Sequence, residues 1–376
     1  MKFVISSTEL LSHLQAVSRV ISSKNTLPIL DNFLFKLSNK ELEITASDLE
    51  STLITRIALE NASEEGSIAI PARILNDALK EFPEQPLTFE INLDNFAVVI
   101  NSETGKFNIV GQNGSDFPQL PDLKDEQKIS FKLSSDVLLA GISNTIFATA
   151  DDELRPVMNG IFIELSPDNL TFVASDAHKL VRYRRTDAGT ETESSFILPR
   201  KPASLLKNIL PGESNEVIVE FDDKNAYFIL EKYKLVSRLI DGNYPSYTSV
   251  IPSDNPNKLT IDRVEFYNAL KRVSVFSNQA SNLIKLKISG NQINISAQDL
   301  DFSVSAYERL NCQYDGEEME IGFKSIFLIE ILSNITSENV IMELSDPTRA
   351  GLLFPVEKEE DNEDVLMLLM PMMINT

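Results

Sequence analysis

The stretch LTFVASDAHKL at residues 170–180 decides how this chain folds. Its apolar run is typical of a β-strand, and the Ser-Asp pair that follows is typical of a turn. Altered copies stand on both sides, LEITASDL at residues 42–49 and INISAQDL at residues 293–300. Their turn aspartates are Asp48, Asp176 and Asp299, which sets the repeat at 128 and then 123 residues. This recurrence predicts three structural units of about 125 residues, an ordinary domain size.

The composition is that of a folded chain without membrane segments. Of the 376 residues, 43% are hydrophobic, which is enough to bury a core in each unit. No apolar run approaches the 18 or more residues that a membrane-spanning helix needs. The first residues, MKFVIS, lead straight into a repeat and do not read as a signal peptide, so we expect a cytoplasmic protein. The single Cys312 excludes an internal disulfide and a multi-thiolate metal site.

Each unit shows the same order of predicted elements. A short strand precedes a helix, a hairpin follows, and another strand leads into a second helix and two closing strands. The hairpins are expected at residues 32–47, 160–175 and 284–297. The helices are expected at residues 7–24, 72–82, 134–149, 200–210, 262–278 and 324–335. Strands that pair with sequence neighbours predict an α+β fold, with two helices on an antiparallel sheet in each unit.

Two helices cover only one face of a sheet, so the units can meet edge to edge and form larger continuous sheets. Proline-bearing segments near residues 116–121 and 243–252 are typical of linkers. We therefore expect the domain boundaries to give units at 1–125, 126–254 and 255–376.

The net charge of −22 argues at first against a nucleic-acid partner. The six predicted helical segments, however, carry a net charge of +4, which leaves −26 on strands and loops. A mildly positive helical face on an acidic body suits loose, sequence-independent contact with phosphates. The alternative, that the helices merely happen to be balanced, stays open from charge alone.

The three turn aspartates also raise the possibility of a carboxylate cluster for hydrolysis or metal binding. Their occurrence once per repeat favours Asx turns instead, in which the side chain caps a strand end. His178 invites a general-base role, but His13 is the only other histidine. The sequence has no nucleophile motif, no glycine-rich phosphate loop and no metal-spaced ligands, so we expect neither catalysis nor a cofactor. The acidic run at 357–364 is typical of a solvated hairpin loop.

Several short motifs, in order along the whole chain, carry a family resemblance. They are LPIL at 27–30, Arg155, MNG at 158–160, ASDAHKL at 174–180, DGNYPSY at 241–247 and MPM at 370–372. Together with the threefold repeat, they make the chain resemble the bacterial DNA polymerase III beta subunits, the sliding clamps. The resemblance implies that three clamp-type domains form half of a closed ring of six domains, which two copies complete head to tail. Helices would line the hole and antiparallel sheet would form the outside.

The resemblance implies a processivity factor of the replicative polymerase rather than an enzyme. A closed ring would slide on duplex DNA without sequence specificity and raise the local concentration of a tethered polymerase. The residues expected to touch DNA weakly are Lys24, Arg73, Arg200, Lys201, Lys271 and Lys324. Polymerase subunits and the clamp loader would bind through short linear peptides, with a glutamine near the start and Leu or Phe at the end. Alternatives are a non-catalytic repeat scaffold that binds only proteins and, less favoured, a hydrolase that uses the repeated aspartates.

The partner pocket that the resemblance implies lies between the second and third units and at the C-terminus. Its lining would be Met158, Ser175, Ala177, His178, Lys179, Leu180, Pro245, Val250, Phe276, Phe327, Leu368, Leu369, Met370, Pro371 and Met372. The chain departs from the family pattern with Lys179 for arginine, Ser249 for a basic residue, Lys324 for an amide and the added Asn375–Thr376. The interface between copies would pair the edge strand bearing Phe107 and Ile109 with the region of Val275 and Phe276.

Overall fold

The computed structural model describes residues 1–121, 123, 128–213, 215–358 and 360–374. The boundary expected near residue 125 and the Asn375–Thr376 extension therefore lie outside the described residues. The chain divides into unit 1, made of Met1–Leu139 and Lys201–Leu239, and unit 2, made of Ala140–Arg200 and Ile240–Thr376. The central repeat thus contributes to both units.

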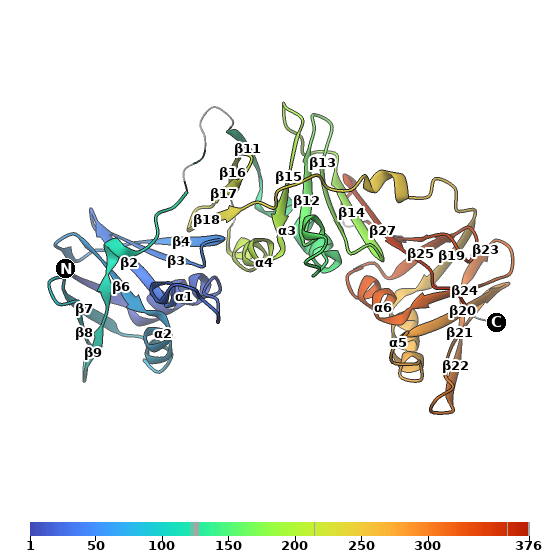
Figure 1. Cartoon of the computed structure of the whole chain (residues 1–376), viewed down its shortest axis with the longest axis horizontal. Coiled ribbons are helices and arrows are strands. Elements are labelled where there is room, and N and C mark those ends of the chain that lie inside the picture. Colours follow the sequence, from blue (N-terminus) through green and yellow to red (C-terminus); the bar gives the residue numbers. More distant parts are fainter. Residues whose placement is uncertain (122, 124–127, 214, 359, 375–376) are drawn as a thin grey trace. The chain divides into compact units, whose positions relative to one another are not determined.

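The three repeats have the predicted order of helices and hairpins (Figure 1), but each has an additional strand after its hairpin and three long closing strands where two were predicted. The first contains β1 (Lys2–Ser6), α1 (Ser7–Ser18), β2 (Asn32–Ser38), β3 (Glu41–Ser47), β4 (Ser51–Ala58), β5 (Ala62–Ser63), β6 (Gly66–Pro71), α2 (Ala72–Lys80), β7 (Pro86–Asn92), β8 (Ala97–Asn101), β9 (Lys106–Val110) and β10 (Gln112–Asn113). The second contains β11 (Ile129–Ser134), α3 (Ser135–Thr145), β12 (Gly160–Leu165), β13 (Leu170–Ser175), β14 (Lys179–Arg185), β15 (Ser194–Pro199), α4 (Arg200–Ile209), β16 (Glu216–Phe221), β17 (Asn225–Ile229) and β18 (Tyr233–Arg238). The third contains β19 (Asn257–Asp262), α5 (Arg263–Ser274), β20 (Leu283–Ser289), β21 (Gln292–Asp299), β22 (Val304–Asn311), β23 (Gln313–Asp315), β24 (Met319–Lys324), α6 (Ser325–Ser333), β25 (Asn339–Leu344), β26 (Gly351–Pro355) and β27 (Glu363–Leu369).

The helices lie where periodicity predicts them but are shorter. The first is expected to reach residue 24 and ends at Ser18, because the polar run SSKNT and Pro28 that follow do not support a helix. Lys24 therefore lies in a loop. With the observed bounds, the described helices carry a net charge of +3, so the predicted contrast with the acidic remainder persists.

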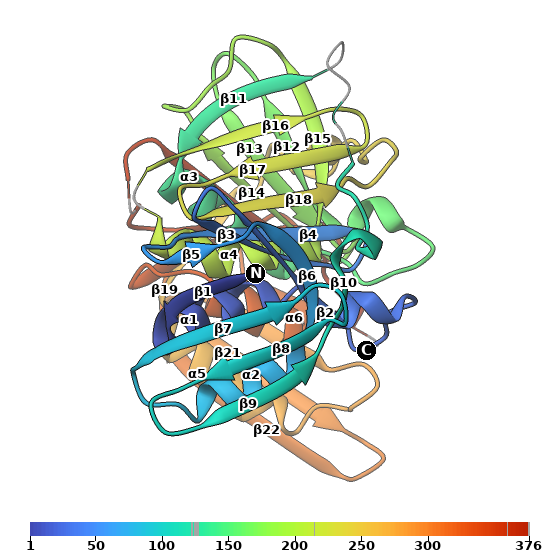
Figure 2. The ribbon, with the colours of Figure 1, turned by 90° about the vertical axis from the view of Figure 1, so that its left-hand side faces the viewer.

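Antiparallel pairing joins the repeats edge to edge, as predicted. In unit 1, one sheet runs β10-β6-β2-β3-β4-β18-β17-β16-β11, and the pairing of β4 with β18 joins the first repeat to the second. In unit 2, the sheet β15-β12-β13-β14-β27-β26-β25-β19-β23 joins the second repeat to the third through β14 and β27. The remaining sheets are β5-β1-β7-β8-β9 and β22-β21-β20-β24. Figures 1 and 2 show β9 at the margin of its sheet.

Helices and sheets enclose the cores. In unit 1, α1 and α2 pack on each other and on β2, β3, β4 and β6, over a stack in which the Phe3 and Phe89 rings are 4.8 Å apart. In unit 2, α5 and α6 pack together, α5 against β20, β21 and β22 and α6 against β24 and β27. Phe172 abuts α3 so closely that a Cβ on Gly141 would lie 2.4 Å from its ring. The glycine permits this approach of helix to sheet.

Each repeat ends by the same route. After β9, Gln112 and Asn113 pair with β6, and after β18 the Ile240 amide donates to the Ile197 carbonyl on β15. The third repeat follows suit, because the Met372 amide donates to the Gly322 carbonyl on β24 at 2.8 Å. The C-terminal tail is thus the repeat counterpart of the two linkers.

The three aspartates form Asx turns, as predicted from their recurrence. Asp48 Oδ1 accepts hydrogen bonds from the amides of Glu50 and Ser51. The carboxylates of Asp176 and Asp299 accept equivalent hydrogen bonds in their own turns, from the backbone amides two and three residues further along the chain. The interpretation of these residues as a carboxylate cluster loses its basis, since each carboxylate is engaged in its own turn.

Candidate functional site

The turn between β13 and β14 forms the centre of the site predicted for partner peptides. The Asp176 carboxylate holds the amides of His178 and Lys179, each at 2.9 Å, and Ala177 adopts a left-handed backbone with φ of 72°. The Ser175 hydroxyl donates to the Lys179 carbonyl at 2.9 Å, which closes the turn. This geometry exposes Ala177 and His178 and turns Lys179 inward, where it is only 4% exposed.

Lys179 meets two carboxylates and an aromatic ring. Its ammonium lies 2.8 Å from Asp176 Oδ2 and 2.9 Å from Glu330 Oε2 on α6. It also lies 4.6 Å from the centre of the Phe327 ring, on which the His178 imidazole stacks at 5.5 Å. Two carboxylates compensate the buried charge, so Lys179 fixes the turn against α6 rather than offering a free cation to a ligand.

The C-terminal tail lies along the same turn. The Met370 amide donates to the His178 carbonyl at 2.9 Å, and two residues later Met372 bridges to Gly322. A Cβ at Gly322 would lie 2.8 Å from the Met372 carbonyl oxygen and 3.0 Å from Ile374, so the glycine leaves room for the tail. Met370 and Met373 are left 42% and 78% exposed. Unbranched thioethers at such a surface adapt to several apolar partners.

An apolar layer beneath the turn brings in further predicted residues. Leu180 on β14 is in register with Leu368 on β27, and both pack with Tyr247 in one buried cluster. Burial and the Glu164 carboxylate that accepts its hydrogen bond raise the pKa of Tyr247 to about 12, so this phenol stays neutral. Pro245 and Val250 flank Tyr247 on exposed positions. The predicted lining therefore combines buried supports with an exposed upper surface.

The remaining predicted lining residues divide into two groups. Leu369 is fully buried opposite Lys179, and Met158 is buried on a short helical turn before β12, so both support the site from below. Phe276 follows the end of α5 and is 39% exposed, and its amide donates to the Val273 carbonyl.

Sequence reasoning missed three parts of this surface. Glu330 lies one turn after Phe327 on α6, a spacing that places both on one helix face. Tyr247 appeared only as the last residue of the motif DGNYPSY, and Gly322 was not singled out. The contribution of each depends on a partner at least 50 residues away along the chain.

The basic residues predicted to face DNA in unit 1 differ in their exposure and in whether their charge is already paired. Arg73, at the start of α2, has a side chain that is 94% exposed and only loosely paired with Asp77 at 3.9 Å. Lys24 is exposed in the loop after α1. Lys201 is held, because its ammonium donates to the Val20 carbonyl at 2.6 Å and pairs with Asp48 Oδ2. Lys207 on α4, which the sequence did not single out, is exposed.

The predicted DNA-facing residues of unit 2 also have different surroundings. Arg200 is exposed at the first position of α4, and Lys271 is exposed on α5 with its ammonium 5.3 Å from the Tyr267 ring. Lys324 lies elsewhere, at the end of β24, with its ammonium 4.9 Å from the centre of the Phe327 ring. Lys324 therefore contacts Phe327, a residue predicted to line the peptide site.

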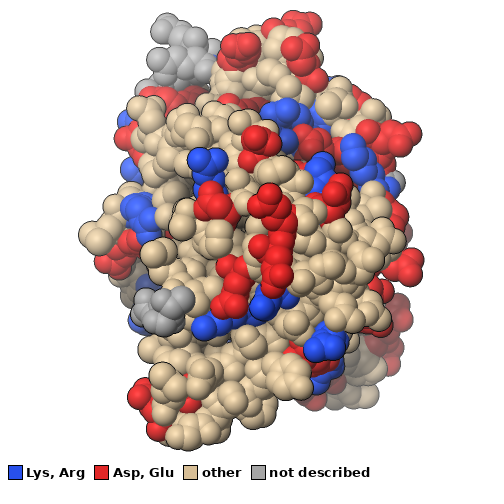
Figure 3. All heavy atoms as spheres, turned by 90° about the vertical axis from the view of Figure 1, so that its right-hand side faces the viewer, with Lys and Arg blue, Asp and Glu red and all other residues tan. Residues whose placement is uncertain are grey.

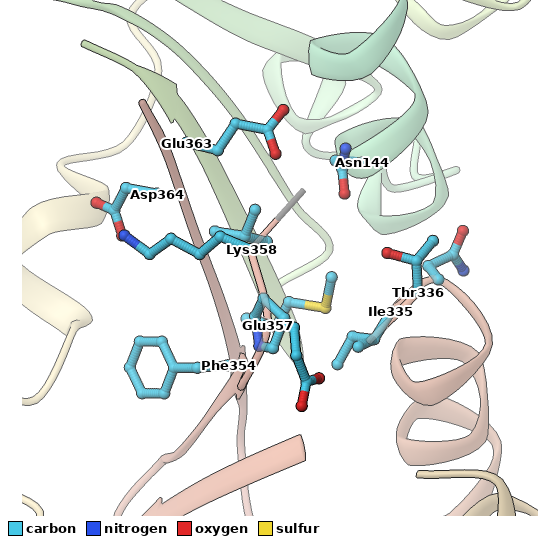
Figure 4. A pocket seen from close by; sticks show the side chains of 12 residues that line it. Asn144, Ile335, Thr336, Phe354, Glu357, Lys358, Glu363 and Asp364 are labelled. Atoms are coloured by element: carbon cyan, nitrogen blue, oxygen red, sulfur yellow. The ribbon is translucent and has the colours of Figure 1, made fainter. Parts of the chain in front are cut away.

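The acidic run at 357–364 was predicted to be a solvated hairpin loop, and it joins β26 to β27, although residue 359 lies outside the described part. The prediction is wrong for its end, because Glu363 and Asp364 belong to β27 and Glu363 is buried. A hollow of about 100 Å³ opens beside it (Figure 4). Figure 4 shows Asn144, Ile335 and Thr336 on one side of this hollow and Glu357, Lys358 and Glu363 on the other. Glu363 accepts a hydrogen bond from Tyr183, and the Asn144 amide donates to the Ala140 carbonyl. The polar groups of Glu363 and Asn144 thus make internal contacts.

Acidic side chains run together across one face of the chain, with basic side chains gathered mainly along the margins of that run (Figure 3). Strands of the third repeat carry ion pairs such as Lys258–Glu343 at 2.9 Å and Lys287–Glu318 at 3.2 Å.

The described residues include no group of three or more His, Cys, Asp or Glu side chains placed to hold a metal ion. Within the same residues, no helix is long and apolar enough to cross a membrane.

Comparison with known proteins assigns the family. Models of the N-terminal, central and C-terminal domains of the DNA polymerase III beta subunit match residues 1–121, 132–246 and 248–373. The beta sliding clamp of Proteus mirabilis is 31% identical over 348 residues, which cover 92% of this chain and 94% of the relative. That of Escherichia coli K12 is 30% identical over 346 residues, 92% of this chain and 93% of the relative. A crystal structure of the Pseudomonas aeruginosa sliding clamp bound to griselimycin superposes with a TM-score of 0.93 at 28% identity, with both chains covered completely. The chain belongs to the DNA polymerase III beta subunit family, the sliding clamps of bacterial replication.

Proposed function

We propose that two copies of this chain join head to tail into a closed ring of six domains, with repeats at 1–125, 126–254 and 255–376. One observation carries the proposal. The strand that follows the Asx turn is β4 in the first repeat and β14 in the second, and each pairs with the last long strand of the next repeat, β18 or β27. The equivalent strand of the third repeat is β22, and the equivalent last strand of the first repeat is β9. Both are edges of their sheets among the described strands.

Pairing β22 of one copy with β9 of another would repeat the two internal junctions and remove the exposed edges. Both edges carry exposed apolar side chains, Phe107 at 41% and Val110 at 72% on β9, and Tyr307 at 76% on β22. Ile109 is 9% exposed and supports β9 from within. Val275 and Phe276 follow α5, which packs on β22, so they flank this junction.

Light scattering at micromolar concentration tests the junction. We expect a dimer for the natural chain and a monomer for Phe107→Asp, because the substitution places a charge between two paired edges. Leu154→Asp is the matched control, since Leu154 is 91% exposed in a loop of the second repeat. A monomeric or trimeric natural chain would contradict the ring of two copies.

The function that follows from a closed ring is topological. A ring around duplex DNA stays bound without a strong contact, so it slides while holding a polymerase near the primer end. Exposed cations such as Arg73, Lys24, Arg200 and Lys271 suit weak, sequence-independent contacts with phosphates. Lys201 contributes less to DNA contact, because Asp48 already neutralises it.

Retention on DNA of different topology distinguishes a ring from a scaffold that binds only proteins. The chain, loaded onto nicked circular DNA by a clamp loader, should remain bound through gel filtration and should leave after the circle is cut once. Equal loss from circular and linear DNA would contradict encirclement.

The surface around His178 and the tail is proposed to hold the partner peptides of polymerase subunits and the clamp loader. Exposed His178, Val250 and Met370 offer the apolar and aromatic contacts that a peptide ending in Leu or Phe needs. This role requires no reaction, so we propose a non-catalytic subunit without a cofactor. Replication in bacteria places it in the cytoplasm.

A further inference from the structure

The hairpin between β21 and β22 is longer than its counterparts in the other two repeats. In those repeats, strand pairing ends at the serine before the turn aspartate, Ser47 or Ser175. In the third repeat, pairing continues to the aspartate itself, because Asp299 lies opposite Val304. The hairpin therefore gains a residue pair, and Figure 1 shows it projecting past α5 of the same repeat.

The tip of this hairpin, residues 300–303, is apolar and exposed. Leu300 is 77% exposed and Phe302 is 74% exposed. Single apolar side chains at a surface are ordinary, but two large ones at the end of a projecting hairpin form a patch that its own copy leaves in water. The tip thus indicates a contact that one copy of the chain does not make by itself.

The other two turns show which element such a turn contacts. Each lies against the start of the second helix of the next repeat. In unit 1, Asp48 pairs with Lys201 at the second position of α4. In unit 2, the His178 ring stacks 5.5 Å from the ring of Phe327 at the third position of α6. For the tip at 300–303, the next repeat of the proposed ring is the first repeat of the second copy, and its second helix is α2.

The start of α2 carries side chains that match the tip. This helix follows β6 directly, as α6 follows β24, so Ile74 takes the third helical position that Phe327 takes in α6. Ile74 is 58% exposed, which leaves its apolar side chain available. The neighbouring charges also match, because the tip contains Asp301 and the residue before Ile74 is Arg73, whose side chain is 94% exposed.

We propose that the hairpin tip of one copy packs on α2 of the other copy, with Leu300 and Phe302 covering Ile74. The inference rests on the proposed ring of two copies and adds a contact outside the pairing of β22 with β9. Salt screens ion pairs but does not weaken apolar contacts. The tip contact therefore keeps the junction shut at high salt and lengthens the time that the ring stays on DNA.

The half-life of the chain on nicked circular DNA, followed by gel filtration after loading, tests the contact. The double variant Leu300→Ser with Phe302→Ser should leave the circle about tenfold faster at high salt, because two apolar side chains lose a buried position. Leu154→Ser is the matched control, since Leu154 is 91% exposed in a loop of the second repeat, and its half-life should equal that of the natural chain.

An exchange of apolar side chains for opposite charges identifies the partner of the tip. Ile74→Lys and Phe302→Glu should each shorten the half-life, because a lone charge then faces an apolar side chain. The two together should recover most of it at low salt, where the new charges pair, and should lose that recovery as salt rises. Ile74→Lys with Leu154→Glu is the matched control, and it should recover nothing.

The outcomes separate the tip contact from the ring. A natural chain that is monomeric by light scattering would overturn both. If the natural chain is a dimer and the serine variants keep its half-life, the tip contact is wrong and the ring stands. If both single charge variants shorten the half-life but their combination recovers none of it, the tip does not pack on Ile74 and the inference is wrong.

Discussion

The turns at Asp48 and Asp176 share one local structure and have different roles. In both, the aspartate Oδ1 accepts two backbone amides, and the next residue, Leu49 or Ala177, has φ of 77° or 72°. The second carboxylate oxygen has a different partner in the two turns. In Asp48 it binds Lys201, which belongs to the next repeat, and in Asp176 it binds Lys179 of its own turn. The first turn thus braces two repeats, and the second forms one wall of a surface.

Both turns expose the residue that follows the aspartate, but different elements pack beside them. The tail and α6 reach the Asp176 turn through the Met370 amide and Glu330, and they leave His178 exposed beside exposed methionines. At the Asp48 turn, the aspartate carboxylate instead contacts Lys201, whose side chain is 41% exposed. The binding role that we propose for the second turn therefore depends on what packs on it rather than on its own conformation.

Removal of Met370 to Thr376 tests whether the tail gives the Asp176 turn its role. We expect peptide binding to fall at least ~30-fold, because loss of two methionine contacts removes about 2 kcal/mol of apolar burial. Fluorescence anisotropy measures the loss, and light scattering should show that the dimer remains, since β9 and β22 are unchanged. Undiminished peptide binding would show that the tail is not part of the site.

Substitution of each aspartate tests whether both turns depend on the same hydrogen bonds. Asp176→Ala and Asp48→Ala should each lower local stability by about 1–3 kcal/mol, because two backbone amides lose their acceptor. Substitution of the aspartate by Asn keeps an oxygen that accepts the two backbone amides and removes only the ion pair with lysine. Asp176→Asn should then cost about 1 kcal/mol, because Lys179 is buried, and Asp48→Asn less than about 0.5 kcal/mol, because solvent screens Lys201.

Hydrogen exchange of residues 42–58 and 170–185 measures these changes separately in the two units. Equal costs for the two Asn variants would show that the burial difference between Lys179 and Lys201 has no energetic consequence.

Glycine at the left-handed positions gives the smallest expected effect. Leu49→Gly and Ala177→Gly should each raise the free energy of unfolding by about 0.5 kcal/mol, because relief of the strained backbone slightly exceeds the extra entropy of the unfolded chain. Thermal unfolding of the paired variants measures the gain. A gain at only one position would mean that the two turns are not conformationally equivalent.

The repeat, the antiparallel fold and the Asx turns were predictable from the sequence, because each depends on residues close along the chain. The helices at 72–80 and 200–209 were predicted within a few residues for the same reason. Lys324 shows the limit of such reasoning. The family resemblance suggested that it touches DNA, and only the structure shows that its ammonium lies over the ring of Phe327, a residue predicted for the peptide site.

The edge strand β22 shows the same limit at the proposed junction between copies. The family resemblance directed attention to Val275 and Phe276 in the third repeat and did not single out β22. An unpaired edge is a property of a sheet, and it becomes visible only when β4–β18 and β14–β27 are seen to be paired.

The amino-acid sequence was sufficient for the threefold repeat, the local turns and the family, because hydrophobic periodicity and turn chemistry act over a few residues. Tertiary structure alone decided which turn lies beside the C-terminal tail at the proposed binding surface, and which carboxylates neutralise Lys179 and Lys201. Those outcomes depend on partners such as Glu330 and Asp48, which lie about 150 residues from the lysines they bind.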